Sequence, residues 1–348
     1  MIHTNEQVYR IGRNGFRIRP FSETAGIHAR GYSRTLQRIV CDFGADHSFG
    51  AVNHKLKEHY GITLPTSAAR KITELHAAGI TKLATSLQVV EHHSATVIIA
   101  ESDGSMIPIC ETYLPEAPEP SVNLSNDRRK HKRLFWKEAR LSMAHAEDSR
   151  TPVFAGTMES VKIAGQQMML CVQQAGATEN TKIHCVGDGA QWIANQVEEK
   201  FGSNGKYLID FYHFCEYLSA AAPYCAKSND VETWLKIQKD ALKSNQYRRV
   251  LHALRPYLEN QTIEDAQAPV RACYRYINNR PNQLDYKTAI EKGLPIGSGE
   301  IESAHRYILQ KRLKLSGAWW LLQHAKNMIN LRTCRANHLW DDYWKKIA

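Results

Sequence analysis

The apolar residues of the first 90 positions recur every three or four residues, which is the spacing of amphipathic helices. Three groups predict three helices: Leu36, Ile39, Val40 and Phe43; Phe49, Val52 and Leu56; and Ala68, Ile72 and Leu75. A glycine-containing turn at residues 60–65 separates the last two, and Thr66 or Ser67 can cap the helix that follows. This pattern matches a helix-turn-helix DNA reader, and a plain three-helix packing unit with its basic residues in water is the alternative.

From about residue 94 the pattern changes to short apolar runs bounded by turn signals, which predict strands. The expected strands are residues 95–100, 106–114, 152–157, 183–186 and 207–211, with helices at 161–174 and 192–201. Residues 127–150 predict a basic helix, and residues 214–290 look wholly helical. The order of these elements is typical of an α/β fold with an RNase H-like mixed five-stranded sheet, helices on both faces and a helical insertion.

The same pattern divides the 348 residues into four segments. Residues 1–90 are expected to form a basic, helical, helix-turn-helix-like domain, and residues 91–213 to begin the domain that contains the RNase H-like sheet. Residues 214–290 are the helical insertion. Residues 291–348 complete the sheet domain and end in basic helices.

Charge and cysteine usage narrow the class of partner. The formal net charge is +10 and the pI is near 9.1, with most of the excess in the two ends of the chain. Such a balance fits nucleic acid before an anionic membrane surface. No apolar run approaches the roughly 18 residues of a membrane span. The eight cysteines are scattered singly, which indicates reduced thiols and a cytoplasmic protein. The positive charge makes double-stranded DNA the expected partner.

Three groups of basic residues are candidates for phosphate contacts, and a solvated helix face is the alternative interpretation for such groups. They are Arg70 and Lys71 near the start of the third helix; Arg128, Arg129 and Lys130 in the basic stretch; and Lys311, Arg312 and Lys314 near the C-terminus.

Three acidic residues lie beside glycine-rich turns at the ends of predicted elements. Asp103 follows the first apolar run, Asp188 follows the fourth between two glycines, and Glu302 falls in the first turn of a helix that a Gly-Ser-Gly turn opens. Cutting and joining DNA needs charge neutralisation at phosphorus, which two Mg²⁺ ions roughly 3.5–4 Å apart supply. Magnesium prefers carboxylate oxygens held on rigid elements, so these three residues are the candidate ligands.

Several neighbouring residues compete for roles at such a site. Glu101 is the alternative to Asp103, because the turn after Asp103 is the least distinctive of the three. Glu300 competes with Glu302, but the two lie about 200° apart on a helix, so only one can face the sheet. Asp210 and His213 lie three residues apart where a predicted strand ends and a helix begins. They can have a catalytic role, or a structural role that fixes the turn between the strand and the helix.

These motifs together resemble a known family. Glu101-Ser102-Asp103-Gly104, Gly187-Asp188-Gly189-Ala190-Gln191-Trp192, Asp210-Phe211-Tyr212-His213 and Gly297-Ser298-Gly299-Glu300-Ile301-Glu302-Ser303 are similar, as a series, to bacterial insertion-sequence transposases of the Kra-type group, which are related to Mutator-like DDE enzymes. The resemblance runs from about residue 95 to about residue 335. It implies an RNase H-like catalytic domain, Asp103, Asp188 and Glu302 as metal ligands, and a helical insertion between the second Asp and the Glu.

The resemblance also implies an activity and its requirements. A member of this group cleaves 3′ ends and transfers strands in a reaction that depends on Mg²⁺, for which Mn²⁺ substitutes. Its partners are the terminal inverted repeats of its element and the target DNA. Because such enzymes pair two ends, we expect a homodimer or higher oligomer on DNA. The expected location is the bacterial cytoplasm, near the nucleoid. A domesticated, non-catalytic DNA-binding protein and an RNase H-like nuclease or resolvase are the alternatives.

Overall fold

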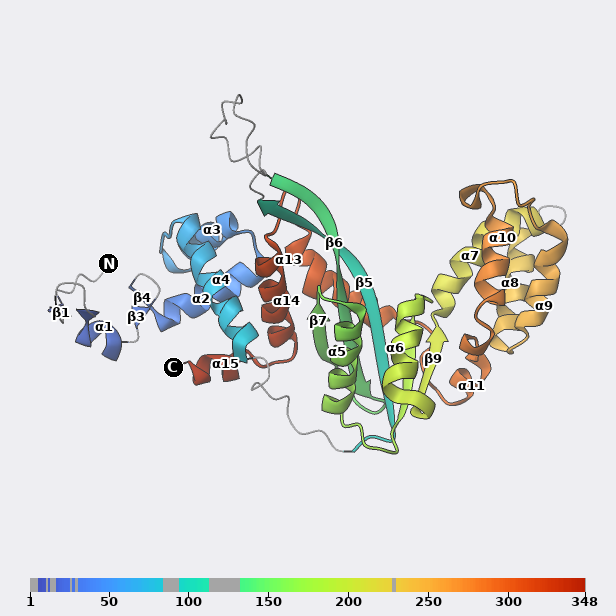
Figure 1. The fold of residues 1–348 in the computed structure, drawn as a ribbon, viewed down its shortest axis with the longest axis horizontal. Helices are drawn as coiled ribbons and strands as arrows, with labels where there is room; N and C mark the ends of the chain where they lie inside the picture. Colours follow the sequence, from blue (N-terminus) through green and yellow to red (C-terminus); the bar gives the residue numbers. More distant parts are fainter. Residues whose placement is uncertain are drawn as a thin grey trace, which may run out of the picture. The chain divides into compact units, whose positions relative to one another are not determined.

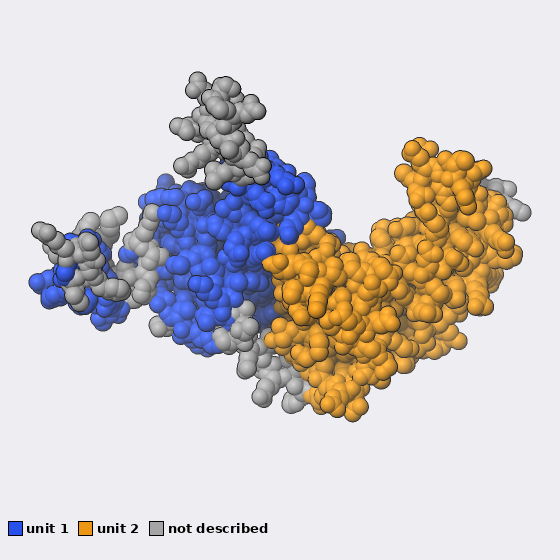
Figure 2. All heavy atoms as spheres, viewed as in Figure 1, with its two compact units in different colours: residues 1–89, 106–137, 306–348 blue, residues 90–105, 138–305 orange. Residues whose placement is uncertain are grey.

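The computed structural model describes residues 6–10, 12, 17–25, 27–28, 31–83, 94–112, 132–226 and 230–347. Contacts between Cα atoms divide the chain into two compact units, drawn in different colours in Figure 2. Unit 1 comprises residues 1–89, 106–137 and 306–348, and unit 2 comprises residues 90–105 and 138–305. The strands β5 and β6 contribute residues to both units.

A five-stranded mixed sheet forms the centre of the fold (Figure 1). Its strands are β5 (Val97–Thr112), β6 (Lys132–Ala146), β7 (Val153–Thr157), β8 (Lys182–Gly187) and β9 (Gly205–Ile209), in the order β7-β6-β5-β8-β9. β5, β8 and β9 are parallel, and β7 is antiparallel to β6. The helix α5 (Val161–Gln174) packs on β7, and α6 (Gln191–Phe201) packs on β9. The order and directions are those of an RNase H-like α/β fold.

Two details of the sheet differ from the sequence-based expectation. The first two expected strands are one continuous strand, β5, which runs through Asp103 and Gly104 without a turn. The prediction of a basic helix at residues 127–150 is wrong, because residues 132–146 form the strand β6. Lys, Arg, Glu and Ala favour a helix in isolation, but β6 pairs with a strand on each side, and such tertiary pairing overrides local propensity.

A helical insertion follows β9 in unit 2. It contains α7 (Phe211–Cys225), α8 (Val231–Lys243), α9 (Tyr247–Leu254), α10 (Pro269–Asn278) and α11 (Tyr286–Glu291). Leu218, Leu242, Val250 and Ile277 lie in its buried core, so these helices have an apolar centre of their own. The short helix α12 (Gly299–Ala304) returns the chain to the sheet, and a π-helical segment, His305–Gln310, continues it.

Unit 1 contains the three helices expected from the first 90 residues. They are α2 (Arg34–Asp46), α3 (Phe49–Tyr60) and α4 (Thr66–Leu83), and Val40, Val52, Leu56 and Ile72 share their core. Leu75, expected on the apolar face, is 52% exposed instead. Before them lie the short elements β1 (Tyr9–Arg10), β2 (Arg17–Ile18), α1 (Pro20–Thr24), β3 (Ile27–His28) and β4 (Tyr32–Ser33).

The C-terminal segment packs on these helices. It contains α13 (Lys311–Leu313), α14 (Leu322–Ala336) and α15 (Trp340–Lys346), and α14 lies along α4. The contact units therefore group residues 306–348 with the N-terminal helices, whereas the four sequence segments join them to the catalytic domain. All eight cysteines are free and buried. Among the described helices, none has the length and apolar character needed to cross a membrane.

Candidate active site

The three acidic residues singled out by the sequence come from three elements of unit 2. Asp103 lies within β5, not at a strand end as expected, and its side chain is about one-third exposed. Asp188 follows β8 directly, and Glu302 lies in the first turn of α12, where it is exposed. The local positions of Asp188 and Glu302 are therefore those that the glycine-rich turns predict.

The sheet register aligns the first two of these residues. β5 and β8 are parallel, and Glu101 pairs with Val186 at the last registered position. Asp103 and Asp188 each follow that pair by two residues. Since β8 ends at Gly187, the register brings the two residues to the same level of the sheet, and the pairing itself stops before them.

The helix α12 is attached to β5 at two points that bracket Glu302. The Ile301 amide donates a hydrogen bond to Oε2 of Glu101 at 2.8 Å. One turn later, Nε2 of buried His305 lies 3.1 Å from the Asp103 carbonyl oxygen and 3.7 Å from its Oδ2. These contacts hold the helix that carries Glu302 against the strand that carries Asp103.

A third contact distinguishes Glu302 from Glu300. Oε2 of Glu300 lies 3.4 Å from Nε2 of His145, which is buried on β6. Glu300 and Glu302 lie about 200° apart around the helix. Glu302 therefore does not share the direction of Glu300, which faces His145 on β6.

Glu101 is a buried acid at the centre of this arrangement. Its side chain is 1% exposed. Burial raises the pKa of Glu101 to about 8, with the nearby carboxylates of Glu300, Asp210 and Glu302 acting in the same direction and the hydrogen bond from Ile301 acting against it. Glu101 is therefore largely protonated at neutral pH, and it positions α12 through its carboxyl group.

The loop that carries Asp188 is held by aromatic residues that the sequence analysis did not single out. The hydroxyl of Tyr276, on α10 of the insertion, donates to the Asp188 carbonyl at 2.8 Å, and the Tyr207 hydroxyl accepts from the Gly189 amide at 2.9 Å. Gly189 has a φ of +87°, and an added Cβ would lie 2.4 Å from the Tyr276 hydroxyl. This loop needs glycine for both reasons. Nothing near Tyr276 in the sequence indicates this contact.

The structure gives Asp210 and His213 different surroundings. Asp210 is buried, and its two carboxylate oxygens accept four hydrogen bonds, from Tyr212 N, His213 N, Ser298 N and Ser298 Oγ. The His213 ring is partly exposed, with Nδ1 3.4 Å from Oε2 of Glu216. Asp210 thus connects the start of α7 to the turn before α12, whereas His213 lies on the outer part of α7.

The three carboxylates have the chemistry of Mg²⁺ ligands, since they are hard oxygen donors on rigid elements. Among the described residues, no three His, Cys, Asp or Glu side chains form a group already gathered around one metal position. Magnesium keeps several waters and takes oxygens from substrate phosphates, so a site of this kind need not be closed by protein alone. The donor set fits the ion in chemical type.

The basic residues expected at DNA differ in exposure. Arg70, Lys71, Lys311 and Lys314 are exposed. Arg312 differs from these four: it is 2% exposed, its Nε donates to the Gly44 carbonyl at 2.9 Å, and its guanidinium lies against the rings of Phe49 and Trp320. Arg128, Arg129 and Lys130 lie outside the described residues.

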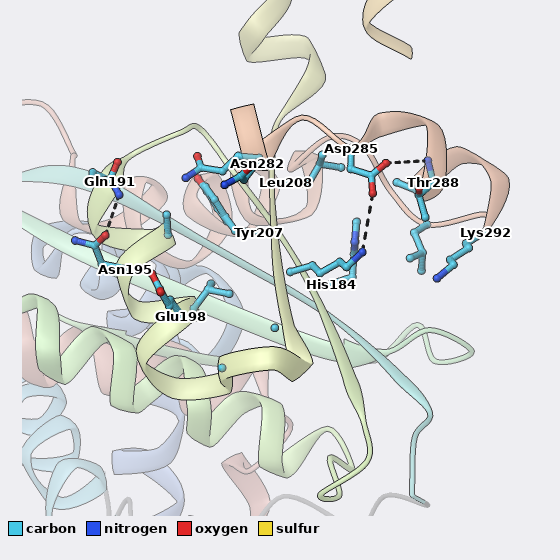
Figure 3. A pocket seen from close by; sticks show the side chains of 18 residues that line it. His184, Gln191, Asn195, Glu198, Tyr207, Leu208, Asn282, Asp285, Thr288 and Lys292 are labelled. Carbon is cyan, nitrogen blue, oxygen red and sulfur yellow. Dashed lines mark hydrogen bonds and ion pairs between the residues drawn. The ribbon is translucent and has the colours of Figure 1, made fainter. Parts of the chain in front are cut away.

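A cavity of about 330 Å³ in unit 2 lies beside α6 and β9 (Figure 3). Gln191 and Asn195 are hydrogen-bonded to each other on its wall, and Asp285 accepts from the Thr288 amide. The lining includes none of Asp103, Asp188 and Glu302. This cavity is therefore separate from the carboxylates and carries no argument about their chemistry.

Comparison with known proteins gives a family for the chain. No curated protein matches it. Among solved structures, a Drosophila P element transposase strand transfer complex is similar at 11% identity, with a TM-score of 0.33, over 94% of this chain and 83% of that one. The model of an uncharacterised protein family, UPF0236, matches residues 166–342, just over half of the chain, including Asp188, Asp210 and Glu302 but not Asp103. The chain belongs to the UPF0236 family.

Proposed function

We propose that this protein is a DDE-type DNA transposase that binds the ends of its insertion sequence and cuts and joins DNA strands with Asp103, Asp188 and Glu302. One observation carries the proposal: α12 is fastened to β5 on both sides of Glu302, at Glu101 and at Asp103. The parallel register of β5 and β8 supports the same grouping, because Asp103 and Asp188 each come two residues after the last registered pair, Glu101 and Val186.

Each residue has a defined task in this proposal. Asp103, Asp188 and Glu302 would hold Mg²⁺, which when bound neutralises charge at the reacting phosphate and its attacking and leaving oxygens. Glu101 and His305 keep α12 against β5, and Asp210 holds the turn from which α12 begins. The exposed basic residues Arg70, Lys71, Lys311 and Lys314 would contact DNA phosphates.

Cleavage assays with amide variants of the acidic residues test the acidic triad. The substrate is a plasmid that carries the coding region with its flanking DNA, incubated with Mg²⁺ or Mn²⁺. We expect Asp188→Asn and Glu302→Gln to lower nicking by about 100-fold or more, as loss of a group that stabilises the transition state does. Glu300→Gln, on the same helix but directed toward His145, is the control and should keep most activity. Equal cleavage by the Glu302 variant and wild type would refute the assignment.

The products separate a transposase from a nuclease. With pre-cleaved ends and a target plasmid, a transposase joins the 3′ ends to the target, whereas an RNase H-like nuclease or resolvase leaves them unjoined. Failure to join while nicking persists would replace transposition with the nuclease alternative.

A second candidate function is a domesticated DNA-binding protein without catalysis. The observation behind it is the set of exposed basic side chains, Arg70, Lys71, Lys311 and Lys314, which can contact DNA phosphates without any metal. This candidate predicts binding to the flanking ends with no cleavage at any Mg²⁺ or Mn²⁺ concentration. Cleavage that Asp188→Asn abolishes would exclude it.

A further inference from the structure

A cavity of about 400 Å³ lies within unit 1, and its lining includes no residue of the acidic triad. Ser48 and Phe49, where α3 begins, form one side of it, and Arg70 of α4 forms another. The segment from Arg312 to His324 provides the rest. Residues from α3, from α4 and from the segment 312–324 therefore meet at one cavity.

Arg312 provides an unused hydrogen-bond donor in the cavity wall. Its side chain is almost fully buried, with the guanidinium 4.6 Å from the Phe49 ring and 4.7 Å from the Trp320 ring. Nε donates to the Gly44 carbonyl, but Nη2 has no acceptor among the described residues. A buried N–H group without a partner is costly, and a cationic one pairs best with an anionic oxygen.

The other charges around the cavity leave it positive. Glu74 is its one acidic wall residue, and this carboxylate already faces His324 Nδ1 at 2.8 Å and Arg70 Nε at 3.9 Å. Two arginines thus oppose one carboxylate. The positive end of α3, a helix of twelve residues, opens on the same side and adds to the attraction for an anion.

An aromatic ring stands beside these donors on a rigid backbone. Trp319 lines the cavity and is 43% exposed. The next residue, Trp320, is bound to β5 through Cys110 N, which donates to its carbonyl at 2.8 Å, and through its own amide, which donates to the Pro108 carbonyl at 3.1 Å. The Trp319 ring also lies 6.1 Å from the Trp136 ring, and the part of it that is open to solvent suits stacking on a planar base, whatever the base is.

We propose that this cavity binds one unstacked nucleotide of a DNA strand, with its phosphate on Arg312 and Arg70 and its base on Trp319. The inference deepens the proposed function, because a transposase handles strand ends that are no longer paired. It concerns binding alone and needs neither metal nor cleavage. Failure of this inference is therefore distinguishable from failure of the catalytic proposal.

Binding of single-stranded DNA to the full-length protein tests the cavity. A fluorescent oligothymidylate of about twelve nucleotides is titrated in EDTA and followed by anisotropy. Arg312 is left intact because it is buried, and exposed wall residues are changed instead. Trp319→Ala should weaken binding by about tenfold or more, the usual loss for a stacking residue. Arg70→Gln should weaken it several-fold and reduce the salt slope by about 0.7.

Two exposed residues of the same unit, Lys57 and Tyr60, provide matched controls, since neither lines the cavity. Lys57→Gln and Tyr60→Ala should bind like wild type. Affinities of Trp319→Ala and Arg70→Gln within twofold of these controls would overturn the proposal. Thymidine 5′-monophosphate competes in a separate titration, and affinity equal to that of the oligonucleotide would overturn the assignment to a DNA strand.

Discussion

The amide and the hydroxyl of Ser298 both donate to the same oxygen of Asp210, Oδ2, each at 2.6 Å. The other oxygen, Oδ1, accepts from the amides of Tyr212 and His213 at 2.6 and 3.0 Å. One carboxylate, 4% exposed, therefore caps α7 and fixes the turn from which α12 begins. The position of Glu302 depends on this connection, although Asp210 itself need not touch substrate.

Removing either partner of this connection should destabilise unit 2 by different amounts. Asp210→Ala loses the helix cap and leaves buried donors unpaired, so we expect its free energy of unfolding to fall by ~2–4 kcal/mol. Ser298→Ala loses only the hydroxyl bond and should cost ~1 kcal/mol. Urea denaturation measures both, with exposed Ser303→Ala as the control. Equal losses for the Asp210 and Ser298 variants would contradict this division of roles.

The buried carboxyl of Glu101 should make stability depend on pH in the metal-free protein. Its pKa is raised from 4.5 to about 8, chiefly by burial, so the folded state keeps a proton that the unfolded state loses above 4.5. Stability is then fully present below pH 4.5 and declines as pH rises toward 8. Glu101→Gln keeps an acceptor for Ile301 and cannot ionise, so it should exceed wild type above pH 8 by on the order of 1–3 kcal/mol.

Thermal denaturation of both proteins in EDTA, from pH 4.5 to 9, measures this difference. The two melting temperatures should be close at the acidic end and diverge as the pH rises. Parallel profiles across the whole range would show that Glu101 ionises normally in the folded protein.

Much of the sheet and of the acidic motif could be predicted because their signals are local. Glycines beside Asp188 and before Glu302 mark turns, and the structure has an element boundary at each. Asp103 with Gly104 gives the same signal, yet β5 continues through it because neighbouring strands pair with the chain there. Residues 132–146 form a strand for the same reason, and no local pattern reveals pairing with distant strands.

The residues that support the site could not be predicted, because their partners are far away in the sequence. Tyr276 reaches Asp188 from the insertion, and His305 reaches Asp103 from beyond it. Arg312 looks like a phosphate ligand in a basic run, but the rings of Phe49 and Trp320 enclose it. Burial of a charged side chain depends on tertiary packing, which composition and spacing do not contain.

Because Arg312 is enclosed by two rings, changing it should affect stability more than changing the nearby exposed residue Lys314. Arg312→Lys loses the planar group between two rings, and an ammonium does not replace the fixed geometry of the bond to Gly44. We expect unit 1 to lose ~1–3 kcal/mol of stability. Lys314→Gln, two residues away and exposed, should change stability by less than about 0.5 kcal/mol. Thermal denaturation compares them, and similar losses would mean that Arg312 is not held as described.

His76 connects three helices of unit 1 and should make their packing sensitive to acid. Its Nε2 lies 2.9 Å from Oε1 of Gln37 on α2, and its Nδ1 lies 2.8 Å from the hydroxyl of Tyr343 on α15. Burial, followed by the charge of Arg34, lowers the pKa of His76 from 6.5 to about 4. The neutral ring suits both bonds, because Nε2–H donates to Gln37 while Nδ1 accepts from Tyr343.

The sign of the effect follows from the lowered pKa. Between pH 6.5 and 4 the unfolded state binds a proton that the folded state does not, so stability is full above 6.5 and falls as pH drops toward 4. The His76→Gln variant cannot titrate at this position. Its free energy of unfolding should be lower than that of wild type by ~1–2 kcal/mol at pH 7, and this difference should shrink as the pH falls. Urea denaturation at pH 7, 5.5 and 4.5 measures the difference. Because Tyr343 lies on α15, the hydrogen-exchange protection factors of residues 340–346 should fall over the same range in wild type but not in the variant. A constant difference in stability with unchanged protection factors would exclude His76 as the titrating group.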